Sequence, residues 1–432
     1  MIYQIFRYIL GLAARIYFKK ITIISDQALP KDKGLVLVAN HHSGVMDAIL
    51  IAIISPRPLL FLTRGESFDT PLKRWMWSLL NMIPIYRPHI TPKLSAKNKG
   101  IMQHCRKQLL KGKALTIFPE GLSQTARRLK TIKTGAARIV LEAAAEGGYA
   151  DELVLVPIGL NYSNPHRFRS EVLINIGPPI ELEEDYQVHQ KDQRRAVQQL
   201  SGKIADSLEA LIIHLRSPDL DPLYDQLYQV HQEVLCQAAR PFPKRVFKEQ
   251  QHLAQTLQHL YDQNPQAIQQ LKKTMDAYMG LHILLRQKRQ EVLRGKLRYQ
   301  RMIQQLVFQY AKVHYFLVMH TTRYLTERWT KRPDFYGTLL LCLGTLMSMI
   351  WLPLQIGIAY WIGGIALGLL YGSSLIAILP IALAQYDQQQ VICKITTGKT
   401  DDLSHRQLET YRLEIIDLLN DHKLVRTKSK LS

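Results

Sequence analysis

The stretch Leu35-Val-Leu-Val-Ala39 runs directly into Asn40-His41-His42-Ser43-Gly44-Val45-Met46-Asp47, and an apolar run, 48–54, follows. The first run is short and apolar, which is typical of a buried strand, and the last predicts a helix. The polar loop therefore joins a strand to a helix. A carboxylate one turn beyond a histidine can hold one ring nitrogen and leave the other as a general base.

The regions around this loop alternate short apolar runs with helical stretches as far as about residue 179. The further predicted strands are 59–62, 114–118, 153–157 and 172–176, and the predicted helices are 70–82, 96–110 and 134–146. Strands that alternate with helices favour an α/β sandwich around a mostly parallel or mixed sheet.

Further polar segments lie near the ends of predicted strands. Ile83-Pro-Ile-Tyr-Arg87 ends a helix-to-strand passage, Phe118-Pro-Glu-Gly121 follows a strand, and Val156-Pro-Ile-Gly-Leu-Asn-Tyr162 ends another. Leu129-Lys-Thr-Ile-Lys-Thr-Gly-Ala-Ala137 opens the next helix. In an open α/β sheet, ligands bind beyond the carboxyl ends of the strands. We therefore expect these segments and the 40–47 loop to share one site.

Four of these segments resemble, in order and approximate spacing, the four motifs of the glycerolipid acyltransferase superfamily, over about residues 20–180. They are the 40–47 loop, the segment that ends at Arg87, Phe118–Gly121 and the segment centred on Pro157. Residues 159–170 and 176–180 look most like the glycerol-3-phosphate/dihydroxyacetone-phosphate acyltransferase group. The resemblance implies a glycerolipid-acyltransferase-like α/β sandwich around a mixed sheet. It also implies an enzyme of phospholipid biosynthesis that transfers a fatty acyl group from acyl-CoA or acyl carrier protein to glycerol 3-phosphate and/or dihydroxyacetone phosphate.

The same resemblance implies a catalytic histidine–aspartate pair. We favour His41 as its histidine, which would make His42 a loop or substrate-contacting residue, and His42 is the alternative. The usual superfamily spacing, His-x4-Asp, selects His42 with Asp47, whereas the His-x5-Asp spacing of the closer subgroup selects His41. The histidine would remove a proton from the acceptor hydroxyl as that hydroxyl attacks the thioester carbonyl. One departure from the family pattern follows the third motif, where Leu122-Ser-Gln124 replaces the common Thr-Arg.

Four further residues are candidates for substrate binding. Arg87 and Lys133 would hold the acceptor phosphate, because cations at strand ends and helix starts suit anions; the alternative is that both are surface cations. By its motif position, Glu120 would help to bind the acceptor hydroxyls, or else it would form a buried salt bridge. Gly121 would permit a tight turn beside the ligand.

The sequence shows no metal-ligand cluster and no dinucleotide fingerprint, so we expect no metal and no cofactor beyond the acyl thioester. The four cysteines are scattered without ligand spacing, which suits a reducing cytosolic face; they are Cys105, Cys236, Cys342 and Cys393.

The charge and hydropathy patterns point to a membrane. The net charge of +21 predicts attraction to nucleic acid, anionic lipid or phosphorylated molecules. Residues 1–20 form a predicted amphipathic helix with a basic end, which would lie in a membrane interface or pack on the domain. The acyltransferase-like domain would span 21–183, and a basic α-helical region 184–334.

Residues 335–386 contain no charged side chain, a length that suits a two-span transmembrane hairpin. The favoured turn is 353–357, with 363–364 as the alternative. Basic residues flank both ends, which predicts an integral membrane protein whose catalytic domain and tail, 387–432, lie on the cytoplasmic face.

Three other functions compete with this interpretation. The acceptor could be lysophosphatidate or another lysophospholipid, or the chain could be an inactive membrane-anchored lipid-binding scaffold. A nucleic-acid binder is disfavoured because the hairpin would hold the basic surface at a membrane and no aromatic–basic motif is present. The expected partners are therefore an acyl thioester donor, a glycerol phosphate acceptor and anionic membrane lipid, with no nucleic acid.

Overall fold

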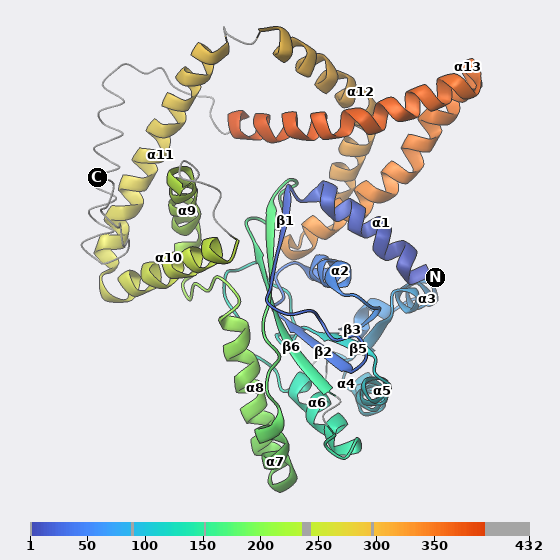
Figure 1. The fold of residues 1–432 in the computed structure, drawn as a ribbon, viewed down its shortest axis with the longest axis vertical. Helices are drawn as coiled ribbons and strands as arrows, with labels where there is room; N and C mark the ends of the chain where they lie inside the picture. The colour runs from blue at the N-terminus through green and yellow to red at the C-terminus, as the bar shows by residue number, and fades with distance from the viewer. Residues whose placement is uncertain (1, 88–89, 151–152, 236–242, 295–297, 394–432) are drawn as a thin grey trace. The chain divides into compact units, whose positions relative to one another are not determined.

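The structure is a computed structural model that describes residues 2–87, 90–150, 153–235, 243–294 and 298–393. It contains two compact units (Figure 1). Unit 1 comprises residues up to His214 together with Thr330–Cys342, and unit 2 comprises Leu215–Trp329 with the chain from Leu343 onward. The boundaries of these units differ from the domain boundaries that the sequence predicted, at 183/184 and 334/335. Two helices beyond 183 and the start of the apolar region both belong to unit 1.

Unit 1 is built on a seven-stranded mixed sheet with the order β1-β7-β6-β2-β5-β3-β4. The five strands from β6 to β4 run parallel to one another, and β7 is antiparallel to β6 and parallel to β1. This arrangement confirms the mixed sheet. The strands are β1 Lys20–Ser25, β2 Gly34–Ala39, β3 Leu59–Arg64, β4 Met82–Ile85, β5 Ala114–Ile117, β6 Leu153–Tyr162 and β7 Glu171–Ile176.

Helices cover both faces of this sheet and form two hydrophobic cores with it. One core joins the sheet to α1 (Ile2–Tyr17), α2 (Gly44–Ile54) and Leu341. The other joins it to α5, α6 and α8. The remaining elements of unit 1 that frame these cores are η1 Gly65–Phe68, α3 Pro71–Leu79, α4 Pro92–Ser95, α5 Asn98–Leu110, α6 Gly135–Glu146, α7 Glu183–Lys191 and α8 Gln193–Glu209.

The N-terminal helix α1 combines features of the two alternatives considered for it. It runs beside α2 (Figure 1), and its Arg7 guanidinium donates to the carbonyl oxygens of Ile53 and Ser55 at the end of that helix. Its other side leaves several large apolar residues exposed, namely Ile2, Ile5, Phe6, Tyr8 and Leu12. The helix therefore packs on the domain and still presents an apolar surface.

Unit 2 is helical in its described residues, as expected for the region after the sheet. It contains η2 (Pro218–Leu220), α9 (Asp221–Leu235), α10 (Pro243–Gln263), α11 (Pro265–Arg294), α12 (Arg298–Trp329) and most of α13 (Pro333–Cys393). Within α13, Pro333–Asp387 is the one stretch of the described chain that is long and apolar enough to cross a membrane.

The apolar region bends at Gly363 and Gly364, where the backbone leaves the helical conformation (φ −136° and +72°). The favoured turn at 353–357 was therefore wrong, and the break lies at the alternative position. The two halves of α13 then pack together: the Tyr371 hydroxyl donates to the Gln355 side chain at 2.6 Å. Only glycine adopts the Gly364 conformation readily, whereas a proline such as Pro353 can sit in a helix when its surroundings satisfy the freed backbone groups.

Candidate active site

The loop between β2 and α2 brings one of the two candidate histidines to the aspartate. Nδ1 of His41 lies 2.8 Å from Oδ2 of Asp47. With its proton on Nδ1, the ring donates to the carboxylate, so Nε2 presents a lone pair. No other residue within the described part of the chain bonds to this ring, and the His41 side chain is 17% exposed. The ring is thus partly exposed, and its Nε2 makes no hydrogen bond to the described residues.

Asp47 is fully buried, and its carboxylate is held from three sides. Besides His41, Oδ2 accepts the backbone N–H of Ser43 at 2.8 Å, and Oδ1 accepts the Tyr162 hydroxyl at 2.5 Å. Burial raises the pKa of Tyr162 well above its ordinary value, so the phenol stays neutral and donates. These hydrogen bonds compensate for the removal of a carboxylate from water.

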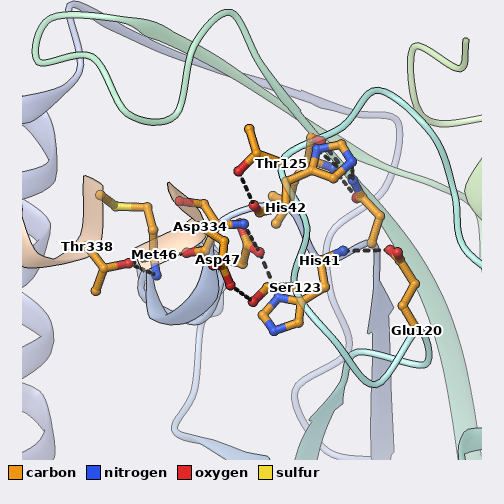
Figure 2. Close-up of polar contacts among 12 residues, drawn as sticks. His41, His42, Met46, Asp47, Glu120, Ser123, Thr125, Asp334 and Thr338 are labelled. Atoms are coloured by element: carbon orange, nitrogen blue, oxygen red, sulfur yellow. Dashed lines mark hydrogen bonds and ion pairs between the residues drawn. The ribbon is translucent and has the colours of Figure 1, made fainter. Parts of the chain in front are cut away.

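The segment after β5 supports His41 from the other direction. The His41 ring stacks on Phe118 with 4.2 Å between the ring centroids. Glu120 accepts the backbone N–H of His41 at 2.8 Å (Figure 2). It also accepts the backbone N–H of Lys130 at 3.3 Å. Burial raises the pKa of Glu120 to about 7. Because both Glu120 oxygens contact backbone groups, this side chain ties two loops together, a role that the sequence did not predict.

Backbone contacts complete the junction between these loops. The Gln124 N–H donates to the His41 carbonyl at 3.0 Å, and the Thr125 hydroxyl donates to the His42 carbonyl at 3.3 Å. Gly121 has a φ of +73°, as the expected tight turn requires. The Lys133 side chain crosses this glycine, and a Cβ atom added at Gly121 would lie 2.6 Å from its Nζ. Lys133 thus lies next to the Phe-Pro-Glu-Gly turn.

His42 occupies a different environment from its neighbour. Its ring is buried beside the Asn40 side-chain amide, whose nitrogen lies 3.3 Å from Nε2. Burial lowers the pKa of His42 to about 4, so this ring is neutral near pH 7. Asn40 in turn exchanges two hydrogen bonds with the backbone of Leu160, at 2.9 and 2.7 Å. These bonds tie the loop to β6, the strand that carries Tyr162.

Arg87 and Arg64 form a small basic group at the ends of β4 and β3. The Nε of Arg87 lies 3.3 Å from Glu66. Arg64 is half-buried, and its guanidinium stacks on Phe335 at 5.3 Å. Its pKa is lowered, first by burial and then by Arg332 and Arg87. Among the described residues, no carboxylate lies within ion-pair distance of the Arg64 guanidinium. It thus has hydrogen-bond donors left for an anion.

Apart from His42, which is buried beside Asn40, the sequence-based candidates fall into three groups. His41, Asp47, Glu120 and Gly121 are joined through the β2–α2 and post-β5 loops; Lys133 lies beside Gly121; and Arg87 belongs to the Arg64 group. Tyr162, Asn40, Phe118 and Arg64 were not assigned roles from sequence, although the first three lie within motifs that had been noted. No group of acidic, histidine or cysteine side chains in the described residues is arranged to hold a metal ion.

The fold and the buried histidine–aspartate pair define an α/β domain whose polar loops meet at the carboxyl ends of parallel strands. Residues 20–161 match the family described as Acyltransferase. This match confirms, for that region, the predicted resemblance to the glycerolipid acyltransferase superfamily.

Several curated proteins are similar to the same region. An uncharacterized acyltransferase of Schizosaccharomyces pombe is 32% identical over 28% of this chain and 18% of its own length. A 1-acyl-sn-glycerol-3-phosphate acyltransferase of Chlamydomonas reinhardtii is 31% identical over 30% of this chain and 37% of its own. Glycerol-3-phosphate O-acyltransferase 1 of Saccharomyces cerevisiae is 34% identical over 22% and 13%, respectively. The chain thus spans less than two-fifths of each relative.

Among solved structures, the 1-acyl-sn-glycerophosphate acyltransferase PlsC of Thermotoga maritima is similar, with 17% identity and a TM-score of 0.31. That similarity covers 45% of this chain and 78% of the PlsC chain.

Proposed function

We propose that this chain is a membrane-bound O-acyltransferase that transfers a fatty acyl group from an acyl thioester to a hydroxyl of glycerol 3-phosphate and/or dihydroxyacetone phosphate. The observation that carries the proposal is the His41–Asp47 pair, in which a buried carboxylate holds Nδ1 while the partly exposed ring leaves Nε2 without a hydrogen bond to the described residues. The match to the acyltransferase family over residues 20–161 supports the reaction class.

The proposed reaction is a direct transfer with His41 as the general base. Nε2 takes the proton of the acceptor hydroxyl as its oxygen attacks the thioester carbonyl carbon, and Asp47 stabilises the imidazolium that forms. Collapse of the tetrahedral intermediate breaks the C–S bond, and the imidazolium returns the proton to the departing thiolate. General-base catalysis of this kind contributes roughly 10²–10⁴-fold.

The acceptor phosphate is proposed to bind at Arg64 and Arg87, with Lys133 as a further candidate. Guanidinium groups suit phosphate because their N–H donors match two oxygens at once. Arg64 supports this assignment because it is half-buried, lies near other cations and has no carboxylate partner among the described residues. Glu120 remains a candidate for binding the acceptor hydroxyls.

The membrane assignment rests on α13. Its apolar side chains are exposed in unit 2, and Trp361 next to the turn is 86% exposed, which suits a lipid environment. We propose that the halves of α13 on either side of Gly363–Gly364 span the membrane as a hairpin. The catalytic unit would then lie on the cytoplasmic face.

A thiol-release assay tests the reaction. Membranes that contain the full chain receive acyl-CoA, or acyl carrier protein loaded with an acyl group, and one acceptor at a time. We expect release with glycerol 3-phosphate or dihydroxyacetone phosphate. Release with lysophosphatidate alone would favour the lysophosphatidate acyltransferase, a reaction named in one of the relatives. Acceptor-independent release would indicate hydrolysis of the thioester and contradict transfer. No release with any acceptor would contradict the enzyme and favour the inactive scaffold.

Variants of the two histidines test the assignment of the base. His41→Ala and Asp47→Asn should each lower kcat by roughly 10²–10⁴-fold. His42→Ala serves as the neighbouring control, and it should retain far more activity because the His42 ring contacts Asn40. If His42→Ala lost activity as severely as His41→Ala without unfolding, His41 would not be the unique base.

A further inference from the structure

The first turns of α13 belong to unit 1 and contact the catalytic loop directly. The hydroxyl of Thr338 accepts the backbone N–H of Met46 at 3.1 Å and donates to the carbonyl of Ser43 at 3.2 Å. Thr338 is 5% exposed, and it lies 292 positions beyond Met46 in the sequence. A buried hydroxyl from the start of the apolar helix thus bridges the turn between His41 and Asp47.

The same segment also contacts the loop that follows β5. Asp334 accepts a hydrogen bond from the Ser123 hydroxyl, and its carboxylate is paired with Arg332 at 2.6 Å. Ser123 lies where the sequence departs from the family's usual Thr-Arg, and the next residue, Gln124, bonds to the His41 carbonyl. Figure 2 shows Glu120 on one side of the catalytic loop and Thr338 on the other.

The packing at this junction is close. A Cβ atom added at Gly44, whose φ is +48°, would lie 3.2 Å from the Asp334 carbonyl oxygen and 3.4 Å from the Phe335 ring. Leu341, further along the helix, is 3% exposed in the core shared with α2. Residues 334–341 therefore fit against the loop as an integral part of unit 1.

The hydrogen bonds link Thr338 to the reacting groups through one intermediate. Ser43, whose carbonyl accepts the Thr338 hydroxyl, donates its own N–H to Oδ2 of Asp47, the oxygen that also holds His41. A shift of the Ser43–Met46 turn would therefore move the carboxylate. Displacements of about 1 Å in a catalytic group can lower a rate by about 10²-fold.

We propose that Thr338 is a positioning residue for acyl transfer, and that the start of the apolar helix braces the His41–Asp47 loop in its reactive geometry. This inference rests on the proposed function for its effect on the rate. The brace itself is a structural claim that can be measured without any reaction.

The kinetic test compares two substitutions at Thr338 with a matched control. Thr338→Val keeps the shape and removes both hydrogen bonds, and Thr338→Ser keeps the hydroxyl. Thr326→Val is the control, because Thr326 is also a fully buried threonine but donates to the Thr322 carbonyl of its own helix, α12. We expect Thr338→Val to lower kcat about 10- to 100-fold with acceptor KM within about twofold. Thr338→Ser and Thr326→Val should both stay within about threefold of the unsubstituted chain.

The activity-independent test is amide hydrogen exchange of the detergent-purified full chain, followed on peptides that cover 41–50. Thr338→Val should speed the exchange of the Met46 amide, since the amide loses one of its two acceptors, and Thr326→Val should not. Unchanged exchange together with unchanged kcat in Thr338→Val would overturn the brace. Faster exchange in a chain that releases no thiol with any acceptor would support the brace and contradict the proposed function instead.

Discussion

Two neighbouring histidines in the catalytic loop have opposite environments. His41 contacts Asp47 and is partly exposed, whereas His42 is buried with no charged partner at hydrogen-bond distance among the described residues. The two family spacings left both rings as candidates, with His41 favoured. The choice depends on the path of the loop, which turns at Gly44 (φ +48°), and on the aromatic surface that Phe118 offers to His41. Neither feature can be read from the number of residues between His and Asp.

The buried His42 should make the protein sensitive to acid. Its pKa is lowered from 6.5 to about 4 by burial, so the unfolded chain binds the proton first as the pH falls. This contribution to stability is present above pH 6.5 and is lost progressively toward pH 4. Between pH 7 and 5 the free energy of unfolding should therefore fall by about 2 kcal/mol. Thermal unfolding of the purified protein at several pH values measures it.

The control for this prediction is a pair of substitutions. His42→Gln should remove that part of the pH dependence, whereas His104→Gln, at an exposed position on α5, should leave it in place. An identical loss of stability between pH 7 and 5 in the His42→Gln protein would show that the acid sensitivity arises elsewhere.

Arg64 should determine the affinity for the acceptor phosphate. Removal of one charge-assisted contact, as in Arg64→Ala, should raise acceptor KM about 10- to 100-fold and leave the KM of the acyl donor unchanged. Arg74→Ala on the exposed side of α3 is the control for the change in net charge. A rise in the donor KM alone would place the phosphate of the acceptor elsewhere.

At the level of elements, the predictable strands are those that are buried. The cores of β2, β3, β5, β6 and β7 follow from short, largely apolar runs. The short edge strands were harder: β1 is partly exposed along its length, and β4 contains Pro84. Such strands owe their conformation to one neighbour, β7 or β3, so their own sequences carry little signal.

The turn of α13 depends on Gly364. Its backbone angles, φ +72° and ψ −170°, lie in a region that is open essentially only to glycine. Gly364→Ala should therefore destabilise the folded chain by about 1–3 kcal/mol. Thermal unfolding of the detergent-solubilised full chain provides the measurement.

Gly357→Ala is the matched control, because Gly357 lies within the helical part of α13 with no atom within 4 Å of an added Cβ. An alanine there should be neutral or slightly stabilising, since alanine favours helix over glycine by up to about 1 kcal/mol. Equal effects of the two substitutions would argue against a turn at Gly364.

For the whole molecule, the proposed hairpin predicts which segments lie on each side of the membrane. Single cysteines would be introduced by Lys191→Cys in the catalytic unit, Ile362→Cys at the turn and Ser429→Cys in the tail, after replacement of the native cysteines. In sealed, correctly oriented membranes, an impermeant maleimide should label the cysteines of the catalytic unit and the tail from the cytoplasmic side. The cysteine at the turn should be labelled from the other side.

Labelling of the turn from the cytoplasmic side would contradict two spans, and labelling of the tail from the opposite side would indicate a single crossing. The predicted tail, 387–432, lies mostly outside the described residues, which end at 393.

At this scale the sequence predicted the order of an α/β domain, a helical region and an apolar segment. It could not show that 330–342 returns to the catalytic domain, because contacts between distant residues leave no periodic pattern.

That return has a consequence for the synthesis of the protein. Ribosomes release a chain from its N-terminus at about 5–20 residues per second, so His41, Asp47 and Glu120 emerge long before Thr338. If Thr338 braces the loop as proposed, the newly made domain stays catalytically immature until the first turns of α13 have been translated. Efficient acyl transfer would then begin only after the start of α13 leaves the ribosome, and chains cut short before Thr338 would consume acyl thioester slowly.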